Sequence, residues 1–380
     1  MTQRGLTPLG FSGEDARFMR MALRLAARAK GQTFPNPMVG ALVVRSGRVV
    51  GQGYHRKAGG PHAEALALAQ AGPAAAGSTL YLTLEPCSHT GRTPPCTEAI
   101  LKSGIRRVVA AMVDPNPRVR GRGLRRLRAR GVRTAVGILE PEARALNEIF
   151  IHRMSSQRPF ITLKLAQSLD GRIATTAGCS RWISGSAARR WARRLRAEND
   201  AVLVGVNTVL ADNPQLTIRS RVKGGGWRER LLLKIVLDSK LRTPAGARIL
   251  SSSGPVLIAA TRSAPRSREF RLRKAGAEVI RFPSENGKVR LTAVLKKLAR
   301  RGVSRLLIEG GGEVAASALE ARAVDRAVWI IAPKILGGKE AVPAVGGKGV
   351  RSLNRAARLE NVRVRRLGED WVMEGKVRFP

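Results

Sequence analysis

Apolar residues along the first 150 positions follow two periods that alternate along the chain. A helical period is predicted over residues 16–29, where Ser12 and Asp15 form a capping-box pattern ahead of the first apolar positions. Further helices are expected from His62 through residue 71, near residues 96–103, and on both sides of a strand that ends this region. Alternating strands and helices favour a three-layer α/β sandwich. The strand-like runs are MVGALVVR (38–45), RVVGQGY (48–54), STLYLTL (78–84) and RRVVAAMV (106–113).

The alternation restarts after MSSQRP (154–159), and we place a domain boundary there. The predicted domains are residues 12–154 and residues 158–380. The second half is also α/β, and it does not repeat the first half. Its strand-like runs are FITLKLAQS (160–168), DAVLVGV (200–206), LLLKIVLD (231–238), PVLIAA (255–260), AEVIRF (277–282), SRLLIEG (304–310) and AVWIIAP (327–333).

Length and composition agree with two globular domains. A chain of 380 residues with 43% hydrophobic content can bury a separate core in each half. Since no run of eighteen apolar residues occurs, we expect no membrane span. The N-terminus lacks the basic-then-apolar plan of a signal peptide. Three cysteines are too few for a disulfide framework, so a reducing, cytoplasmic setting is expected.

The formal net charge of +42 raises the question whether the protein binds nucleic acid or another polyanion. Basic surfaces attract phosphates on nucleic acids, anionic lipids or small metabolites. Residues 1–156 carry 24 basic and 9 acidic side chains, and the remaining residues carry 45 and 18, so both halves share the excess. The densest stretch, GRGLRRLRARGVR (121–133), is typical of a surface helix followed by a strand. A solvated surface is therefore favoured, and nucleic-acid binding remains the alternative.

Three short motifs predict a metal site: PHAE (61–64), EPC (85–87) and PPC (94–96). A catalytic zinc binds three protein ligands and keeps a fourth position open for water, and His62, Cys87 and Cys96 supply such a set. Glu64 lies two residues after His62, where it can transfer protons without being a ligand. This pattern is the signature of zinc nucleobase deaminases. The alternative is a closed structural zinc with His89 as the fourth ligand, or two buried free cysteines.

The eight residues between the cysteines, together with PNPMVGALVV (35–44) and GYHRKAGGPHAE (53–64), closely resemble the deaminase half of the bifunctional riboflavin-biosynthesis deaminase/reductase family. The resemblance implies that His62, Cys87 and Cys96 bind Zn²⁺ and that Glu64 carries protons. His55 and His89 also match the family motif, and we expect them to serve the substrate pocket or loop order. Asn36, between two prolines, is expected to read the pyrimidine edge; the alternative is a turn residue.

Four segments of the second half carry weaker signals. They are KLAQSLDGRIA (164–174), CSRWISG (179–185), VGVNTVLADNPQLTIR (204–219) and LIEGGGEVAASAL (307–319). The glycine run before a helix suits a phosphate or a plain turn, and it does not match the GxGxxG dinucleotide fingerprint. Trp182 is either a ligand contact or a core aromatic, Ser239 is equally typical of a turn, and we interpret Cys179 as a small buried residue.

In this order the four segments are similar to the reductase half of the same family, so the resemblance spans about residues 14–375. It implies a cytidine-deaminase-like α/β/α domain followed by a dihydrofolate-reductase-like α/β domain that uses NADPH. We expect Glu313 to point to solvent, because a carboxylate would repel cofactor phosphates. The implied NADPH contacts are Ala166, Trp182, Thr208, Asp212, Ser239, Gly311, Gly312, Glu313, Val314, Ala315, Ala316 and Ser317. The implied substrate contacts are Asn36, Ser180, Arg196, Leu216, Arg219 and Glu309.

The expected activity is therefore deamination of 2,5-diamino-6-ribosylamino-4(3H)-pyrimidinone 5′-phosphate, followed by reduction of its ribosyl chain to ribityl. The expected partner is this phosphorylated pyrimidine, with no membrane, only low-salt contact with nucleic acid, and possible self-association through the reductase domain. One rival is a tRNA or single-strand deaminase, although aromatic residues for stacking make up only 4% of the chain. The other rival is a basic scaffold with a structural zinc, which leaves Glu64 without a role.

Overall fold

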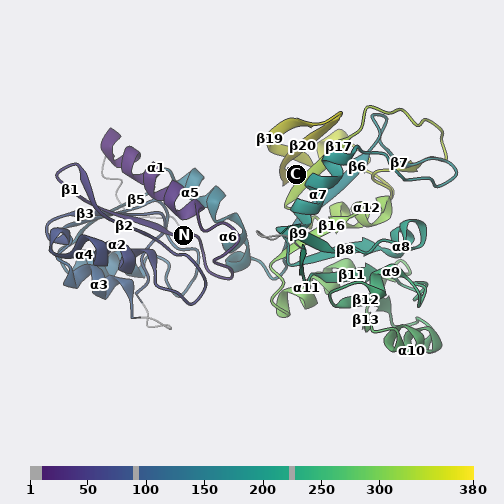
Figure 1. The fold of residues 1–380 in the computed structure, drawn as a ribbon, viewed down its shortest axis with the longest axis horizontal. Coiled ribbons are helices and arrows are strands. Elements are labelled where there is room, and N and C mark those ends of the chain that lie inside the picture. The colour runs from purple at the N-terminus through teal and green to yellow at the C-terminus, as the bar shows by residue number, and fades with distance from the viewer. Residues whose placement is uncertain (1–10, 89–93, 222–226) are drawn as a thin grey trace. The chain divides into compact units, whose positions relative to one another are not determined.

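The computed structural model describes residues 11–88, 94–221 and 227–380, without the side chains of residues 219–221 and 227–230. The chain divides into two compact units, Met1–Ser156 (unit 1) and Gln157–Pro380 (unit 2) (Figure 1). No helix of the described part is both long and apolar enough to cross a membrane.

Unit 1 is built on a five-stranded sheet with the order β2-β1-β3-β4-β5. β1 pairs antiparallel with β2 and β3, whereas β3, β4 and β5 are parallel. The strands are β1 (Gly40–Arg45), β2 (Arg48–Tyr54), β3 (Thr79–Leu82), β4 (Arg107–Ala110) and β5 (Arg133–Val136). The helices are α1 (Gly13–Ala27), α2 (Ala63–Ala71), α3 (Cys96–Lys102), α4 (Arg122–Ala129), α5 (Glu140–Leu146) and α6 (Glu148–Ser155), and a 3₁₀ turn spans Gly72–Ala75.

Helices cover both faces of this sheet, which gives the three layers that the sequence predicted (Figure 1). α2, α3 and α4 bury their apolar side chains against one face. α1 and α5 pack on the other face around Phe18, Met19 and Ala143. The parallel order of β3 and β4 brings the loops that follow them to one edge of the sheet, where the motifs around Cys87 begin.

The capping box predicted from Ser12 and Asp15 is present and extends into a buried network. Asp15 accepts hydrogen bonds from Ser12 N–H at 3.0 Å, Tyr81 OH at 2.8 Å and Arg107 Nη1 at 2.7 Å. Burial raises the pKa of the Asp15 carboxyl, but the hydrogen bonds from Arg107, Ser12 and Tyr81 outweigh this effect and lower it to about 2. The network joins α1 to β3 and β4.

Unit 2 is built on a nine-stranded sheet with the order β13-β12-β11-β8-β16-β6-β17-β20-β19. Its strands run parallel from β13 to β17, and β20 and β19 add an antiparallel end. Those strands are β6 (Phe160–Gln167), β8 (Ala201–Gly205), β11 (Leu233–Leu237), β12 (Val256–Thr261), β13 (Glu278–Phe282), β16 (Arg305–Glu309), β17 (Arg326–Ile331), β19 (Arg358–Leu367) and β20 (Asp370–Arg378).

Helices also cover both faces of the larger sheet. α11 and α12 pack on one face, and α7, α8, α9 and α10 pack on the other. The helices are α7 (Ser186–Ala197), α8 (Val206–Asp212), α9 (Arg248–Ser251), α10 (Arg266–Lys274), α11 (Leu291–Arg300) and α12 (Gly312–Glu320), with a 3₁₀ turn at Leu353–Arg355. Short paired strands lie outside the main sheet: β7 (Arg172–Ala174) with β18 (Val342–Pro343), β9 (Ile218–Arg221) with β10 (Trp227–Arg230), and β14 (Ser284–Glu285) with β15 (Lys288–Val289).

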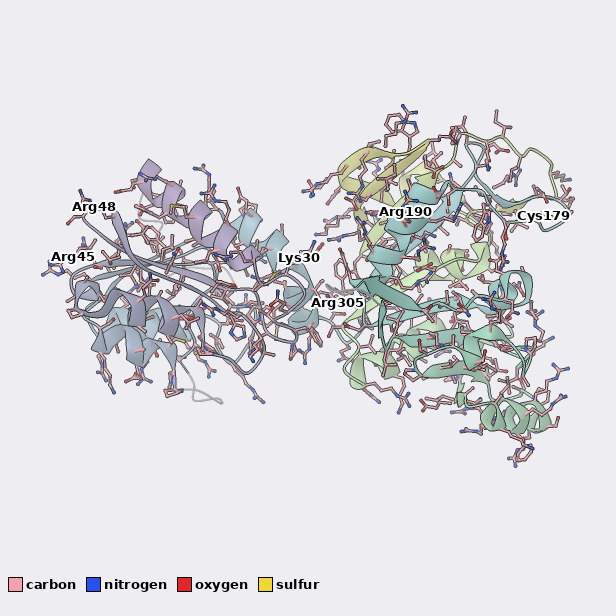
Figure 2. The ribbon with its side chains drawn as sticks, viewed as in Figure 1. Lys30, Arg45, Arg48, Cys179, Arg190 and Arg305 are labelled. Atoms are coloured by element: carbon pink, nitrogen blue, oxygen red, sulfur yellow. The ribbon has the colours of Figure 1, made fainter. Side chains whose placement is uncertain are left out.

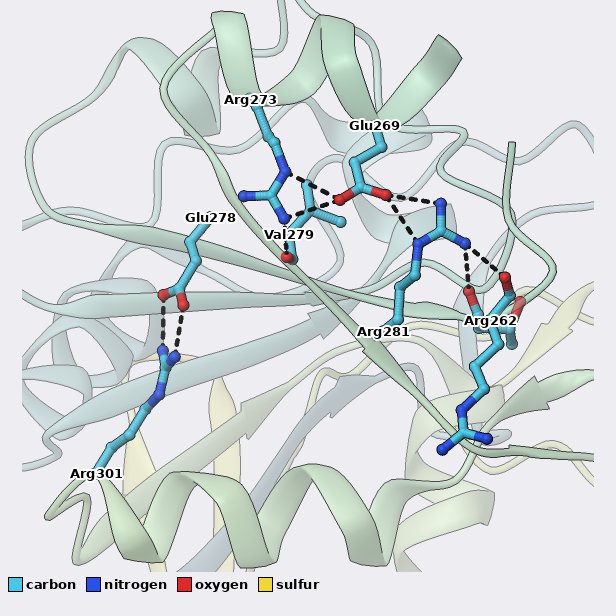
Figure 3. A network of polar contacts seen from close by, with 8 residues as sticks. Arg262, Glu269, Arg273, Glu278, Val279, Arg281 and Arg301 are labelled. Atoms are coloured by element: carbon cyan, nitrogen blue, oxygen red, sulfur yellow. Dashed lines mark hydrogen bonds and ion pairs between the residues drawn. The ribbon is translucent and has the colours of Figure 1, made fainter. Parts of the chain in front are cut away.

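Basic side chains cover both units (Figure 2). Acidic side chains are fewer than basic ones, and one carboxylate serves two guanidinium groups. Glu269 on α10 accepts hydrogen bonds from Arg273 at 2.9 Å and Arg281 at 2.8 Å, and Arg281 also donates to the carbonyl of Arg262 (Figure 3). These contacts tie α10 to the ends of β12 and β13.

The Asp15 network predicts a pH dependence of unit 1. A carboxyl whose pKa is lowered on folding stabilises the fold above its unfolded pKa of about 4, and this contribution is lost as the pH falls through the folded value. Asp15→Asn should therefore lower the free energy of unfolding by about 3 kcal/mol at pH 7 and flatten its decline below pH 4. Far-UV circular dichroism during urea unfolding measures this, while tryptophan fluorescence reports unit 2, since all five tryptophans follow residue 156. Glu140→Gln, in an exposed pair with Arg144, is the control; an equal effect there would contradict the prediction.

Candidate functional site

Three segments of unit 1 bring potential metal ligands together. His62 is the N-cap residue of α2, Cys96 is the first residue of α3, and Cys87 lies in the loop that follows β3. Both helices begin at the site, and helix N-termini favour the thiolate form of nearby cysteines.

The three donor atoms lie at distances that suit one tetrahedral ion. His62 Nδ1 is 3.1 Å from Cys96 Sγ and 3.7 Å from Cys87 Sγ, and all donor atoms lie within 4.8 Å of one another. Zinc bond lengths in a tetrahedral site place such donors about 3.5–3.8 Å apart. Among the described residues the group holds these three donors and no fourth. His89, the alternative fourth ligand, lies outside the described residues.

The electrostatics of the donor group favour a cation. Hydrogen bonding with Cys96 lowers the pKa of Cys87 to about 4, and the same contact raises the pKa of Cys96 because the two thiols share one proton. A hydrogen bond to Cys87 raises the pKa of His62. Glu64 is buried beside the group, and burial raises the pKa of its carboxyl. A divalent ion would displace the shared proton and neutralise the thiolates.

Asn36 and His55 meet next to this group. His55 is buried, its Nδ1 donates to the carbonyl of Pro61 at 3.0 Å, and its Nε2 accepts from Asn36 Nδ2 at 3.1 Å. Burial lowers the pKa of His55, which keeps the ring neutral. The His55 and His62 rings meet edge to face with centroids 5.7 Å apart. Two of the sequence-predicted residues, Asn36 and His62, are therefore linked through His55.

In unit 2, Arg196 of α7 forms a paired ionic contact with Glu309 at the end of β16. Arg196 Nε and Nη2 donate to the two carboxylate oxygens, each at 2.8 Å. Burial raises the pKa of Glu309, but the charge of Arg196 outweighs it, so the pKa is lowered and the carboxyl stays ionised. Lys164 is the neighbour of Glu309 in the sheet register, and burial lowers its pKa. The sequence analysis did not single out Lys164, although a lysine inside the apolar run FITLKLAQS was a usable signal.

Glycines at the start of α12 allow a close approach to α8. A Cβ on Gly311 would lie 3.4 Å from Thr208 Oγ1, and one on Gly312 would lie 2.5 Å from the carbonyl of Pro343. The glycines therefore serve close packing against Thr208 and Pro343, and the N–H groups at the start of this nine-residue helix are of the kind that binds phosphate. Glu313 points away and pairs with Lys288 on the exposed surface.

The remaining candidates of unit 2 lie in several separate segments. Ser180 Oγ donates to Asp212 Oδ1 at 2.6 Å, so two of them touch each other. Ser239 Oγ accepts from the backbone N–H of Val289. Ala166 lies half-buried in β6, Leu216 is buried, and Arg219 belongs to β9 with a side chain outside the described part. Val314, Ala315 and Ala316 face the core and Ser317 Oγ bonds the carbonyl of Glu313, so α12 offers a ligand mainly its backbone.

Two interpretations of single residues change. Cys179 is exposed rather than buried, because it lies in a loop beside Thr175, whose Oγ1 accepts its backbone N–H (Figure 2). Trp182 is 61% exposed, which excludes the core-aromatic alternative. The guanidinium of Arg189 lies 4.4 Å from the centroid of the Trp182 ring.

Comparisons with known proteins cover both units. Residues 12–112 match the family model of the cytidine and deoxycytidylate deaminase zinc-binding region, and residues 159–373 match the RibD C-terminal domain. Riboflavin biosynthesis protein RibD of Aquifex aeolicus is 45% identical over 359 residues, which cover 94% of this chain and 97% of that protein. Its Escherichia coli K12 counterpart is 39% identical over 371 residues, covering 94% and 98%. The chain belongs to the RibD family.

Solved structures agree with this assignment. RibD of Acinetobacter baumannii superposes with a TM-score of 0.80 at 35% identity, over 96% of this chain and 99% of that one. A diaminohydroxyphosphoribosylaminopyrimidine deaminase/5-amino-6-(5-phosphoribosylamino)uracil reductase from Thermotoga maritima gives a TM-score of 0.76 at 33% identity, with the same coverage. The predicted fold classes of both units are confirmed. The cofactors of this RibD family member are zinc in unit 1 and NADPH in unit 2.

Proposed function

We propose that this chain catalyses two consecutive steps of riboflavin biosynthesis. Unit 1 deaminates 2,5-diamino-6-ribosylamino-4(3H)-pyrimidinone 5′-phosphate by hydrolysis, and unit 2 reduces the ribosyl chain of the product to ribityl with NADPH. The observation that carries this proposal is the donor group of His62, Cys87 and Cys96 with Glu64 beside it. Membership of the RibD family supplies the two reactions.

In the deaminase site we assign the proton transfers to Glu64. Zinc, when bound, supplies a Lewis acid that makes water more acidic. The buried Glu64 carboxylate, whose pKa is raised, can take a proton from the attacking water and deliver it to the departing ammonia. His62, Cys87 and Cys96 are the proposed zinc ligands.

We assign recognition of the pyrimidine to Asn36. The neutral His55 ring accepts from the Asn36 amide nitrogen, which turns the Asn36 carbonyl oxygen away from His55. That oxygen is then available to accept a hydrogen bond from an amino group of the substrate. His55 thereby acts through Asn36.

In unit 2 we assign the nucleotide to one set of residues and the cofactor to another. The cofactor, when bound, supplies the hydride that reduces C1′ of the ribose. The bidentate fork of Arg196 already holds Glu309, so we assign Arg196 the role of orienting that carboxylate toward the nucleotide. The proposed substrate set is Ser180, Arg196, Leu216, Arg219 and Glu309. The proposed NADPH set is Ala166, Trp182, Thr208, Asp212, Ser239 and Gly311–Ser317.

Three finer features belong to the same proposal. Cys87 and Cys96 bind metal only when reduced, and a cytoplasmic location provides that condition. We propose that the positive surface attracts phosphorylated small molecules and binds nucleic acid only loosely at low salt. We also propose that the chain self-associates through unit 2, and sedimentation of the two separated units tests this.

The direct test follows both half-reactions separately. Purified zinc-loaded protein given the diaminopyrimidine nucleotide should release ammonia without NADPH, and NADPH should be oxidised only after that release. Ammonia and NADPH absorbance are the two measurements. Deamination of tRNA near 0.15 M salt, where long-range attraction is screened, with no turnover of the nucleotide, would favour the nucleic-acid deaminase instead.

The assignment of Glu64 predicts a separation of metal binding from catalysis. Glu64→Gln keeps the size of the side chain and removes its basic oxygen, so ammonia release should fall at least 10²–10⁴-fold while one zinc stays bound. Zinc content and ammonia release measure the two effects. His62→Ala is the matched control and should lose zinc as well as activity. Near-normal turnover by metal-replete Glu64→Gln would disprove the proton-transfer role.

The two compact units predict independent activities. A fragment of residues 157–380 should bind NADPH and oxidise it when given the deaminated nucleotide, because every reductase residue assigned above lies within it. Fluorescence titration and NADPH absorbance measure this. A fragment of residues 1–156 serves as the complement and should release ammonia only. A folded 157–380 fragment without NADPH binding would show that the proposed domains, 12–154 and 158–380, depend on each other.

A further inference from the structure

Glu85 lies between β3 and the ligand Cys87, and its carboxylate is buried with 3% of the residue exposed. Four backbone N–H groups donate to it. Oε2 accepts from Asp114 at 3.1 Å and Gly121 at 2.8 Å, and Oε1 accepts from Gly123 at 3.0 Å and Leu124 at 3.3 Å. All four donors belong to the segment between β4 and the first turn of α4.

These contacts place the start of α4 directly on the peptide before Cys87. The first N–H groups of a helix lack partners within the helix, and the Glu85 carboxylate supplies acceptors for those of α4. A Cβ on Gly123 would lie 1.9 Å from the carbonyl oxygen of Pro86. Glycine is therefore required at that position for α4 to approach Pro86 so closely.

Because Pro86 is held in place, the position of the next residue, the metal donor Cys87, is restricted as well. Cys87 follows Pro86, its carbonyl accepts from the N–H of Thr97 at 3.2 Å, and its Sγ accepts from the N–H of Cys96 at 3.4 Å. The Cys87 peptide is thus held on one side by Glu85 and α4 and on the other by the first turn of α3, which carries Cys96.

We propose that Glu85 is a positioning residue of the metal centre. Its carboxylate fixes the Cys87 peptide against α4 and so sets the place of Cys87 Sγ relative to His62 and Cys96. This proposal rests on the zinc site of the proposed function. It rests on the hydrogen bonds that Glu85 accepts from four backbone N–H groups.

An isosteric substitution separates these hydrogen bonds from packing. Glu85→Gln keeps one acceptor oxygen for two of the four N–H groups. Its NH₂ group faces the other two N–H groups, and because both sides are donors, no hydrogen bond forms between them. The loop should shift, and zinc affinity should fall about 10–100-fold, the range measured when groups that orient metal ligands are removed. Asp15→Asn is the matched control, since Asp15 is an equally buried carboxylate of unit 1 that also accepts a backbone N–H but lies on α1.

The measurements are competition with a chromophoric chelator for Zn²⁺ and the absorption spectrum of the Co²⁺-loaded protein. Glu85→Gln should show weaker binding and altered thiolate-to-cobalt and d–d bands, whereas Asp15→Asn should match the wild type in both. Gly123→Ala is a second variant that displaces Pro86 while leaving Glu85 in place, and it should produce the same spectral change.

Each outcome bears on the proposal. Wild-type affinity and spectrum in Glu85→Gln, or an equal loss in Asp15→Asn, would overturn it. Folding of either site variant only when Zn²⁺ is supplied supports it, and failure to fold with or without Zn²⁺ assigns Glu85 to general stability instead. Failure of the wild type itself to bind Zn²⁺ would refute the zinc site of the proposed function, and so the two failures can be told apart.

Discussion

The arrangement of unit 1 depends on holding two sulfur atoms and an imidazole within 4.8 Å of one another in a partly buried place. Two thiolates at this distance repel each other, and a bound divalent ion would offset that repulsion. Each donor must therefore be fixed from outside the group. His62 and Cys96 are fixed by their places at the starts of α2 and α3. We propose that the hydrogen bonds from the start of α4 to Glu85 fix the position of Cys87.

Unit 2 also holds charged groups in a buried place, but there the two groups carry opposite charges. Arg196 comes from α7 and Glu309 from the end of β16, and each would be costly to bury without the other. Lys164 lies beside Glu309 in the sheet register, where burial lowers the lysine pKa and so disfavours its charged form. Arg196 is therefore the main ionic partner of Glu309, and its two N–H donors fix the carboxylate at the end of β16.

The sequence was informative wherever function needs particular residue types at fixed spacing. His62, Glu64, Cys87 and Cys96 could be named because few other chemistries use that spacing, and the capping box at Ser12 and Asp15 follows from local hydrogen bonding alone. The C-terminal strands β19 and β20 were not expected. β19 is an exposed edge strand with the sequence RLENVRVRRL, so it lacks the continuous apolar run that marked the buried strands.

Contacts between segments that are distant in the chain could not be predicted from the sequence. Nothing near Glu85 in the chain shows that four N–H groups from residues 114–124 converge on it. The lysine inside the apolar run FITLKLAQS could be noticed in the sequence, but its position beside Glu309 follows only from the pairing of β6 with β16. Cys179 was judged by its residue type although its loop leaves it exposed. The assignment of single residues to NADPH or nucleotide stays a prediction for the same reason.

The large positive charge has a physical consequence for both sites. Basic side chains number 69 against 27 acidic ones, so the surface keeps a positive excess even where one carboxylate serves two arginines, as Glu269 serves Arg273 and Arg281 (Figure 3). Such a field acts over a Debye length of about 10 Å at 0.1 M salt and raises the local concentration of anions. The nucleotide and NADPH both carry phosphates. In the proposed function, the positive surface of each unit favours the arrival of these ligands, and the assigned site residues select between them.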